Sequence, residues 1–79
     1  MQIILFGIAR EIVGSSKIMV PANAAVTTVS QLKTWMKQQY PQLAALTSVA
    51  VAVNSRYAED DEPLEAKSEI AFIPPVSGG

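Results

Sequence analysis

The sequence contains no cysteine and no histidine among its 79 residues. Without cysteine there can be no disulfide framework, thiolate nucleophile or cysteine-based zinc site. Without histidine, the usual proton carrier and metal ligand near neutral pH is missing. A self-contained active site would therefore need Asp, Glu, Lys, Tyr or Ser. We expect no bound metal or intrinsic cofactor, and a cytoplasmic protein is the simplest interpretation.

Clustered positive charge and long apolar runs are missing as well. The formal net charge is -1, and the six basic residues occur singly along the chain. Nucleic-acid binding needs clustered Lys and Arg to neutralise phosphates, so we do not expect it. The apolar run at residues 2–9 has no basic leader and falls well short of the roughly 20 residues that span a bilayer. No membrane association is expected.

Acidic side chains form the only dense group of functional residues, at positions 59–62. The segment lacks the alternating ligands and central glycine of a calcium-binding loop. We interpret it as a solvated loop. Serines 15, 16 and 77 have no evident base beside them, so a serine nucleophile is not expected either.

The length allows one domain, residues 1–79, with a tail at 74–79. β-Branched and apolar runs, separated by turn residues, predict four strands and one main helix between the second and third strands. The strands are expected at residues 2–9, 17–22, 49–53 and 69–73, and the helix at 28–40.

The helix has a clear start and a clear apolar stripe. Thr28 and Gln31 match a capping box, in which each side chain satisfies a backbone N–H of the first turn. Apolar residues then recur every three or four positions, and Pro41 ends the helix. The stripe comprises Val29, Leu32, Met36 and Tyr40, and Trp35 widens it as a core residue or an interface anchor.

The first and last strands are the most uniformly apolar, so they are the best candidates for the centre of the sheet. If they are neighbours, the fold is an α+β β-grasp, or ubiquitin-like, fold with a mixed sheet packed on one helix. A ferredoxin-like fold would need a second long helix, which residues 54–68 do not resemble. One helix covers one sheet face, so Leu43 and Leu46, or another protein, must cover the second face.

The chain ends in "FIPPVSGG", which permits two interpretations. Gly78 and Gly79 have no side chains, and an extended tail of six residues reaches about 20 Å. It could therefore enter a narrow channel. The terminal carboxylate is ionised at neutral pH and is a poor electrophile until a partner converts it to an acyl-adenylate. The alternative is an ordinary frayed terminus.

Several segments resemble the small, sulfur-carrying subunit of molybdopterin synthase along nearly the whole chain. They are "FGIAREIVG", "TVSQL", "VAVNSRYA" and "EIAFIPPVSGG". The sulfur carriers of thiamin biosynthesis are related, but they usually lack the "FxPPVSGG" ending and the "ARE" segment. Two departures, Ser68–Glu69 and Ile73, bear on partner affinity and not on the chemistry.

The resemblance implies that an adenylyltransferase similar to ubiquitin-activating enzymes uses ATP to activate Gly79. A sulfur donor protein would then supply the sulfur of a C-terminal thiocarboxylate. The large catalytic subunit of the synthase would use that sulfur to form the dithiolene that holds molybdenum, in a heterotetramer with two small subunits. The chain would not be catalytic alone.

The resemblance also assigns roles to individual residues. Gly79 is the covalent site, and Gly78, Ser77 and Val76 form the rest of its tail. The candidates for partner contact are Phe6, Arg10, Glu11, Phe72 and Pro75. The alternatives are sulfur delivery to thiamin thiazole or another acceptor, a ubiquitin-like modifier joined through Gly79 to lysines, and a plain interaction module.

Overall fold

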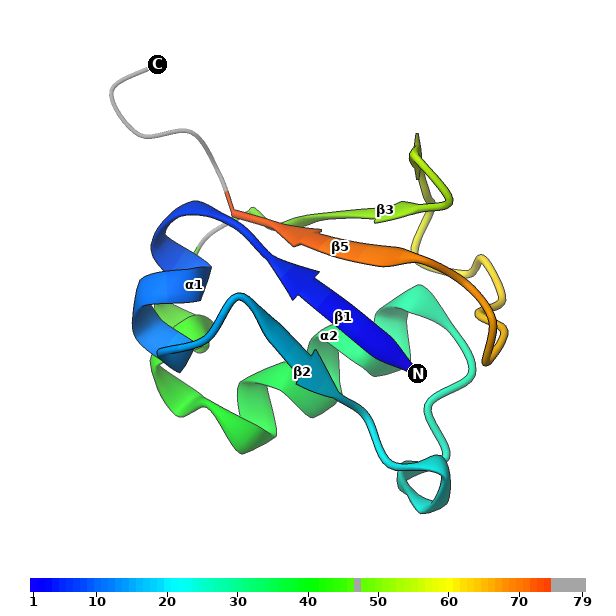
Figure 1. The fold of residues 1–79 in the computed structure, drawn as a ribbon, viewed down its shortest axis with the longest axis horizontal. Coiled ribbons are helices and arrows are strands. Elements are labelled where there is room, and N and C mark those ends of the chain that lie inside the picture. Colours follow the sequence, from blue (N-terminus) through cyan, green and yellow to red (C-terminus); the bar gives the residue numbers. More distant parts are fainter. Residues whose placement is uncertain (47, 75–79) are drawn as a thin grey trace.

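A five-stranded mixed sheet organises the computed structural model, which describes residues 1–46 and 48–74 (Figure 1). The strands lie in the order β2-β1-β5-β3-β4. Central β1 and β5 are parallel, with Leu5 beside Phe72, and every other pair is antiparallel. The predicted pairing of the first and last strands is therefore confirmed. The strand bounds are β1 Gln2–Leu5, β2 Lys17–Met19, β3 Ala50–Val53, β4 Arg56–Tyr57 and β5 Ile70–Ile73.

Two α-helices and two short 3-10 helices complete the fold. Helix α2 (Val29–Gln39) lies behind the sheet in Figure 1, and α1 (Gly7–Val13) follows β1 directly. The 3-10 helices are η1 (Ala22–Ala24) and η2 (Pro41–Ala45). None of the helices in the described ranges is long and apolar enough to cross a membrane.

The prediction of a first strand over residues 2–9 was wrong in its length. The strand ends at Leu5, and the chain turns away from the sheet through Gly7, whose φ is +54°. The remaining apolar residues belong to α1, where Ala9 is completely buried. A strand β4 was also not predicted. It pairs with β3 through a tight turn in which Asn54 and Ser55 both have positive φ.

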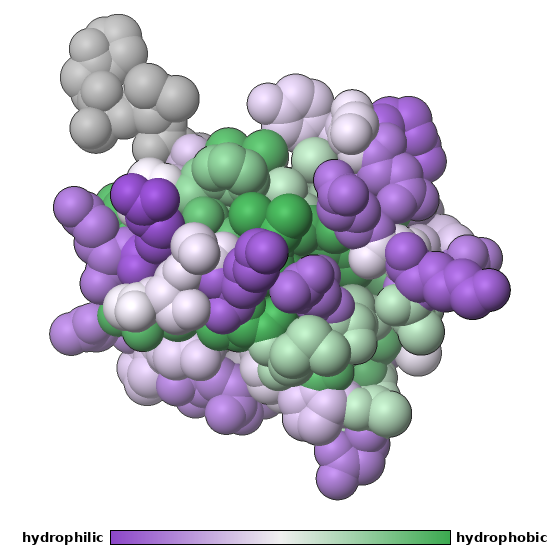
Figure 2. All heavy atoms as spheres, in the orientation of Figure 1, coloured by the Kyte–Doolittle hydropathy of each residue, from purple (hydrophilic) through white to green (hydrophobic). Residues whose placement is uncertain are grey.

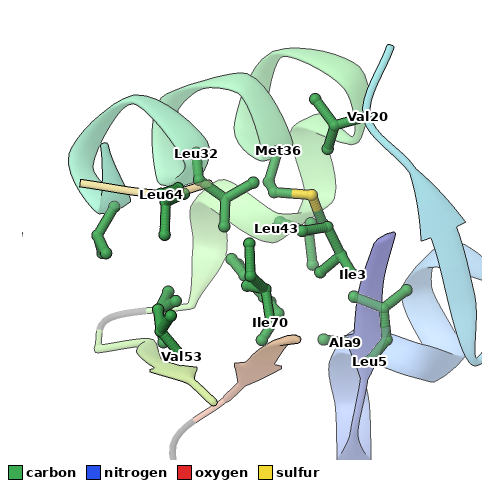
Figure 3. Packing of buried hydrophobic residues seen from close by; sticks show 13 residues of the cluster. Ile3, Leu5, Ala9, Val20, Leu32, Met36, Leu43, Val53, Leu64 and Ile70 are labelled. Carbon is green, nitrogen blue, oxygen red and sulfur yellow. The ribbon is translucent and has the colours of Figure 1, made fainter. Parts of the chain in front are cut away.

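The core lies between α2 and one face of the sheet (Figure 3). Alternate strand residues such as Ile3, Leu5 and Phe72 are at most 1% exposed, as side-chain alternation in strands requires. Leu32 and Met36 of α2 point toward these strands in Figure 3 and are completely buried. No polar or charged side chain is buried in the described part of the chain.

The expectation that Leu43 and Leu46 could cover the second sheet face was wrong. Leu43 is completely buried in the same core as α2, and Leu46 packs against that core. The reason is that Pro41 turns the chain into η2 directly after α2, so the segment stays on the helical side. Leu43 and Leu46 therefore leave the second face of the sheet uncovered.

The acidic segment is more than a solvated loop. Its backbone carbonyls at Glu62 and Asp60 accept hydrogen bonds from the N–H groups of Val29 and Ser30, at 3.1 and 2.8 Å. The Asp60 carboxylate also pairs with Lys33 at 2.7 Å. The segment therefore closes over the first turn of α2, whose N–H groups have no partner within the helix.

Candidate functional site

The candidate site is the place where β5 ends. The parallel register pairs Leu5 with Phe72, so the residues that follow, Gly7 and Pro74, also come close together. Pro74 is buried and is the last residue that the structure describes. In Figure 1, β5 ends beside the connection from β1 to α1. The tail predicted to carry the chemistry therefore begins at this junction.

The predicted covalent site and its tail, Val76 to Gly79, lie outside the described residues, as does Pro75. Of the other predicted contact residues, Phe6 directly precedes α1, and Arg10 and Glu11 lie in the second half of that helix. Phe6 is 48% exposed, and Arg10 and Glu11 are exposed as well. These three side chains are free to meet a partner protein.

The prediction that Phe72 contacts a partner was wrong. Its side chain is 1% exposed, and it is the largest of the fully buried side chains. The reason is the alternation along β5, which directs Ile70 and Phe72 into the core and Ala71 and Ile73 to the opposite face. Phe72 therefore stabilises the core and is not available for partner contact.

An apolar face on the sheet was only partly foreseen from the sequence. Ile4, Ala71 and Ala52 lie side by side across β1, β5 and β3, with Ile73 beside Ala50 in the next row. The space-filling view in Figure 2 shows apolar atoms exposed on this side of the molecule between hydrophilic side chains, some of which reach across its middle. We call these five residues the open face. Met19 and Tyr57, 66% and 71% exposed, flank it on the outer strands.

The small residues of the open face were missed because alanine carries little signal in a strand pattern. Their alternation with Val51, Val53 and Phe72 was visible in the sequence and could have identified them. Ala71 and Ala52 have short side chains, so a partner surface can come close to the sheet at its centre.

A hollow lies beside the open face, and no cluster of metal-binding side chains occurs in the described residues. They hold no group of three or more His, Cys, Asp or Glu side chains placed to bind a metal ion. A hollow of about 270 Å³ beside the open face is lined by Gln2, Ile4 and residues 66–69. It is smaller than most small-molecule sites, and the acidic side chain that lines it, Glu69, is exposed.

Comparison with known proteins decides the family. The model of the ThiS family matches residues 3–79. The chain belongs to the ThiS family. A curated relative, the molybdopterin synthase sulfur carrier subunit of Dictyostelium discoideum, is 36% identical over 81 residues, covering 99% of this chain and 94% of its own.

Solved structures agree with the predicted β-grasp fold. SAMP1 from Haloferax volcanii superimposes with a TM-score of 0.79 at 26% identity, over 99% of this chain and 97% of its own. A complex of subunits 1 and 2 of the molybdopterin-converting factor from Helicobacter pylori matches with a TM-score of 0.64 at 23% identity. That match covers 99% of this chain and 96% of the other, and it shows the fold alone.

Proposed function

We propose that the protein is the sulfur carrier subunit of a molybdopterin synthase. One observation carries the proposal: a relative of that name shares 36% of its residues with this chain over nearly the full length of both. The family match also runs through Gly78 and Gly79, the residues on which the chemistry would depend. The β-grasp fold and the apolar face for a partner support the same conclusion.

In this proposal, the carboxylate of Gly79 attacks ATP on an adenylating enzyme, and pyrophosphate leaves. The product is a mixed anhydride with AMP, which makes the ionised carboxylate into an electrophile. Hydrosulfide (HS⁻), released from a donor protein's persulfide by a cellular thiol that reduces the S–S bond, then attacks the carbonyl carbon. The bond to AMP breaks, and a thiocarboxylate remains at Gly79. The large subunit transfers this sulfur to a pterin precursor, so the protein's own part is to carry and present it.

The open face is proposed as the docking surface for that large subunit. The cores of protein interfaces are apolar, and the aligned apolar residues of the open face fit such a core. Phe6, Arg10 and Glu11, which are exposed at the start of and within α1, are proposed as further contact residues. Docking here would place the tail of the carrier at the large subunit. A heterotetramer with two carriers would deliver the two sulfurs of one dithiolene.

A second candidate is a protein modifier joined through Gly79 to lysines. The likeness to SAMP1 supports it, because proteins of that name are called small archaeal modifier proteins. Higher-mass adducts in cell extracts would identify this role.

Sulfur delivery to thiazole is a third candidate. Measuring the affinity of the protein for each candidate large subunit in turn would separate thiazole synthesis from molybdopterin synthesis.

The test is intact mass spectrometry after incubation with the cognate activating enzyme, ATP and a sulfur source. A gain of about 16 Da, from oxygen to sulfur, is expected for the full chain and not without ATP. A chain lacking Gly79 should gain nothing. Its melting temperature should be unchanged, because every buried residue of the described part lies at or before Pro74. An unmodified full chain beside a competent activating enzyme would refute the proposal.

A further inference from the structure

Gly7 differs from an ordinary turn glycine in its contact with the end of β5. Its φ of +54° lies in the left-handed region, which favours glycine. A Cβ atom built on Gly7 would lie 3.2 Å from Cγ of Pro74 and 4.0 Å from its Cδ. The first distance is shorter than an ordinary van der Waals contact between carbon atoms. The proline ring therefore occupies the space next to a residue that has no side chain.

The topology explains why these two residues meet. β1 and β5 are parallel and in register up to Leu5 and Phe72. Phe6 is still extended, with φ −126° and ψ 159°, and the chain then bends at Gly7 into α1. The other chain runs on through Ile73 to the buried Pro74. Since proline has no N–H to donate, packing against its neighbours must hold the ring in place.

We propose that Gly7 is a positioning residue for the C-terminal tail. By leaving room for Pro74, Gly7 fixes the position of the last described residue, from which the chain continues toward Gly79. This inference rests on the proposed function and deepens it: the docked domain presents the carboxylate in register with the partner only if Pro74 is seated. Gly7 touches no reacting atom and is not a catalytic residue.

The chain supplies a matched control for the test. Gly14 also has a positive φ, +84°, but a Cβ there would meet no atom within 4 Å. Gly7→Ala and Gly14→Ala therefore both strain the backbone, whereas only Gly7→Ala crowds Pro74. The melting temperature of each variant measures the loss of stability that comes from placing alanine at a positive φ, which both variants share.

The first readout is the kinetics of thiocarboxylate formation by the cognate activating enzyme. We expect Gly7→Ala to lower kcat about tenfold with little change in KM, because a small misplacement of a reacting group slows the chemical step more than docking. Gly14→Ala should keep both constants within about twofold, because no side chain near the tail changes. Equal kcat values for the two variants would overturn the proposal.

The second readout does not depend on the function. In NMR spectra, the amide signals of Ile73 and residues 76–79 should move more in Gly7→Ala than in Gly14→Ala, and equal shifts would overturn the proposal. If the unaltered chain gains no sulfur, the proposed function fails, and this comparison still decides the role of Gly7.

If Gly7→Ala does not fold, Pro74→Ala, which removes the ring carbons, takes its place. A wild-type kcat for Pro74→Ala would contradict the inference.

Discussion

Two methionines show how position decides what one side chain contributes. Met36 extends from α2 into the core and is completely buried, next to Ile3 and Leu43 in Figure 3. Met19 on the outer strand β2 is 66% exposed. The same side chain therefore stabilises the fold at one position and is available to a partner at the other.

Met36→Ala should lower the free energy of unfolding by about 2–5 kcal/mol, because it removes buried methylene groups and leaves a cavity. In a domain of this size that is a large part of the total stability. The matched control, Met19→Ala, should change the same quantity by less than about 0.5 kcal/mol. Urea denaturation followed by circular dichroism measures both, and similar losses for the two would contradict the packing described.

At the scale of elements, the start of α2 is stabilised by residues from two parts of the chain. Thr28 accepts from the N–H of Gln31 through its Oγ1 at 3.2 Å, as the capping box predicts. The reciprocal bond differs: Oε1 of Gln31 accepts from the backbone N–H of Thr27 at 2.7 Å, one residue earlier than expected. Carbonyls of the acidic segment accept from the two remaining N–H groups of the turn.

Thr28→Ala should lower the free energy of unfolding by about 1 kcal/mol, because one N–H of the first turn loses its acceptor. Thr34→Ala is the control, since Thr34 is exposed in the middle of the same helix and alanine favours helix there. It should be neutral or slightly stabilising. If urea titrations gave the same loss of unfolding free energy for Thr28→Ala and Thr34→Ala, the capping hydrogen bond of Thr28 would contribute nothing to stability.

At the scale of the whole molecule, the two faces of the sheet have different surroundings. α2 and η2 bury one face in a core without polar side chains among the described residues. The other face presents the aligned Ile4, Ala71 and Ala52 at its centre. Under the proposed function, the first face stabilises the fold, and the second face binds the large subunit so that the tail can reach it.

Ala71→Glu should weaken binding to the large synthase subunit at least about tenfold, because it places a charge at the centre of the apolar interface. Ala44→Glu is the control, since Ala44 is exposed on η2, on the helical side. It should bind as the unaltered chain does. Isothermal titration calorimetry measures the affinities, and unchanged melting temperatures would show that the fold is intact. Tight binding by Ala71→Glu would exclude this face as the docking surface.

The sequence by itself determined the elements whose signals are local. The cap at Thr28, the stripe of Val29, Leu32 and Met36, and the stop at Pro41 predicted α2 to within one residue at each end. The apolar character of the first and last strands also predicted that they pair at the centre, and the motifs predicted the carrier family.

The tertiary structure alone decided features that depend on contacts between distant segments. Residues 6–9 are apolar enough for a strand, but the turn at Gly7 directs them into α1. Phe72 and Ala71 are adjacent in sequence, yet the position of α2 decides which one is buried. The contact of Gly7 with Pro74 joins the two ends of the chain and depends on the parallel register of β1 and β5. Local sequence patterns do not predict contacts between distant residues, because those residues come together only once the sheet has formed.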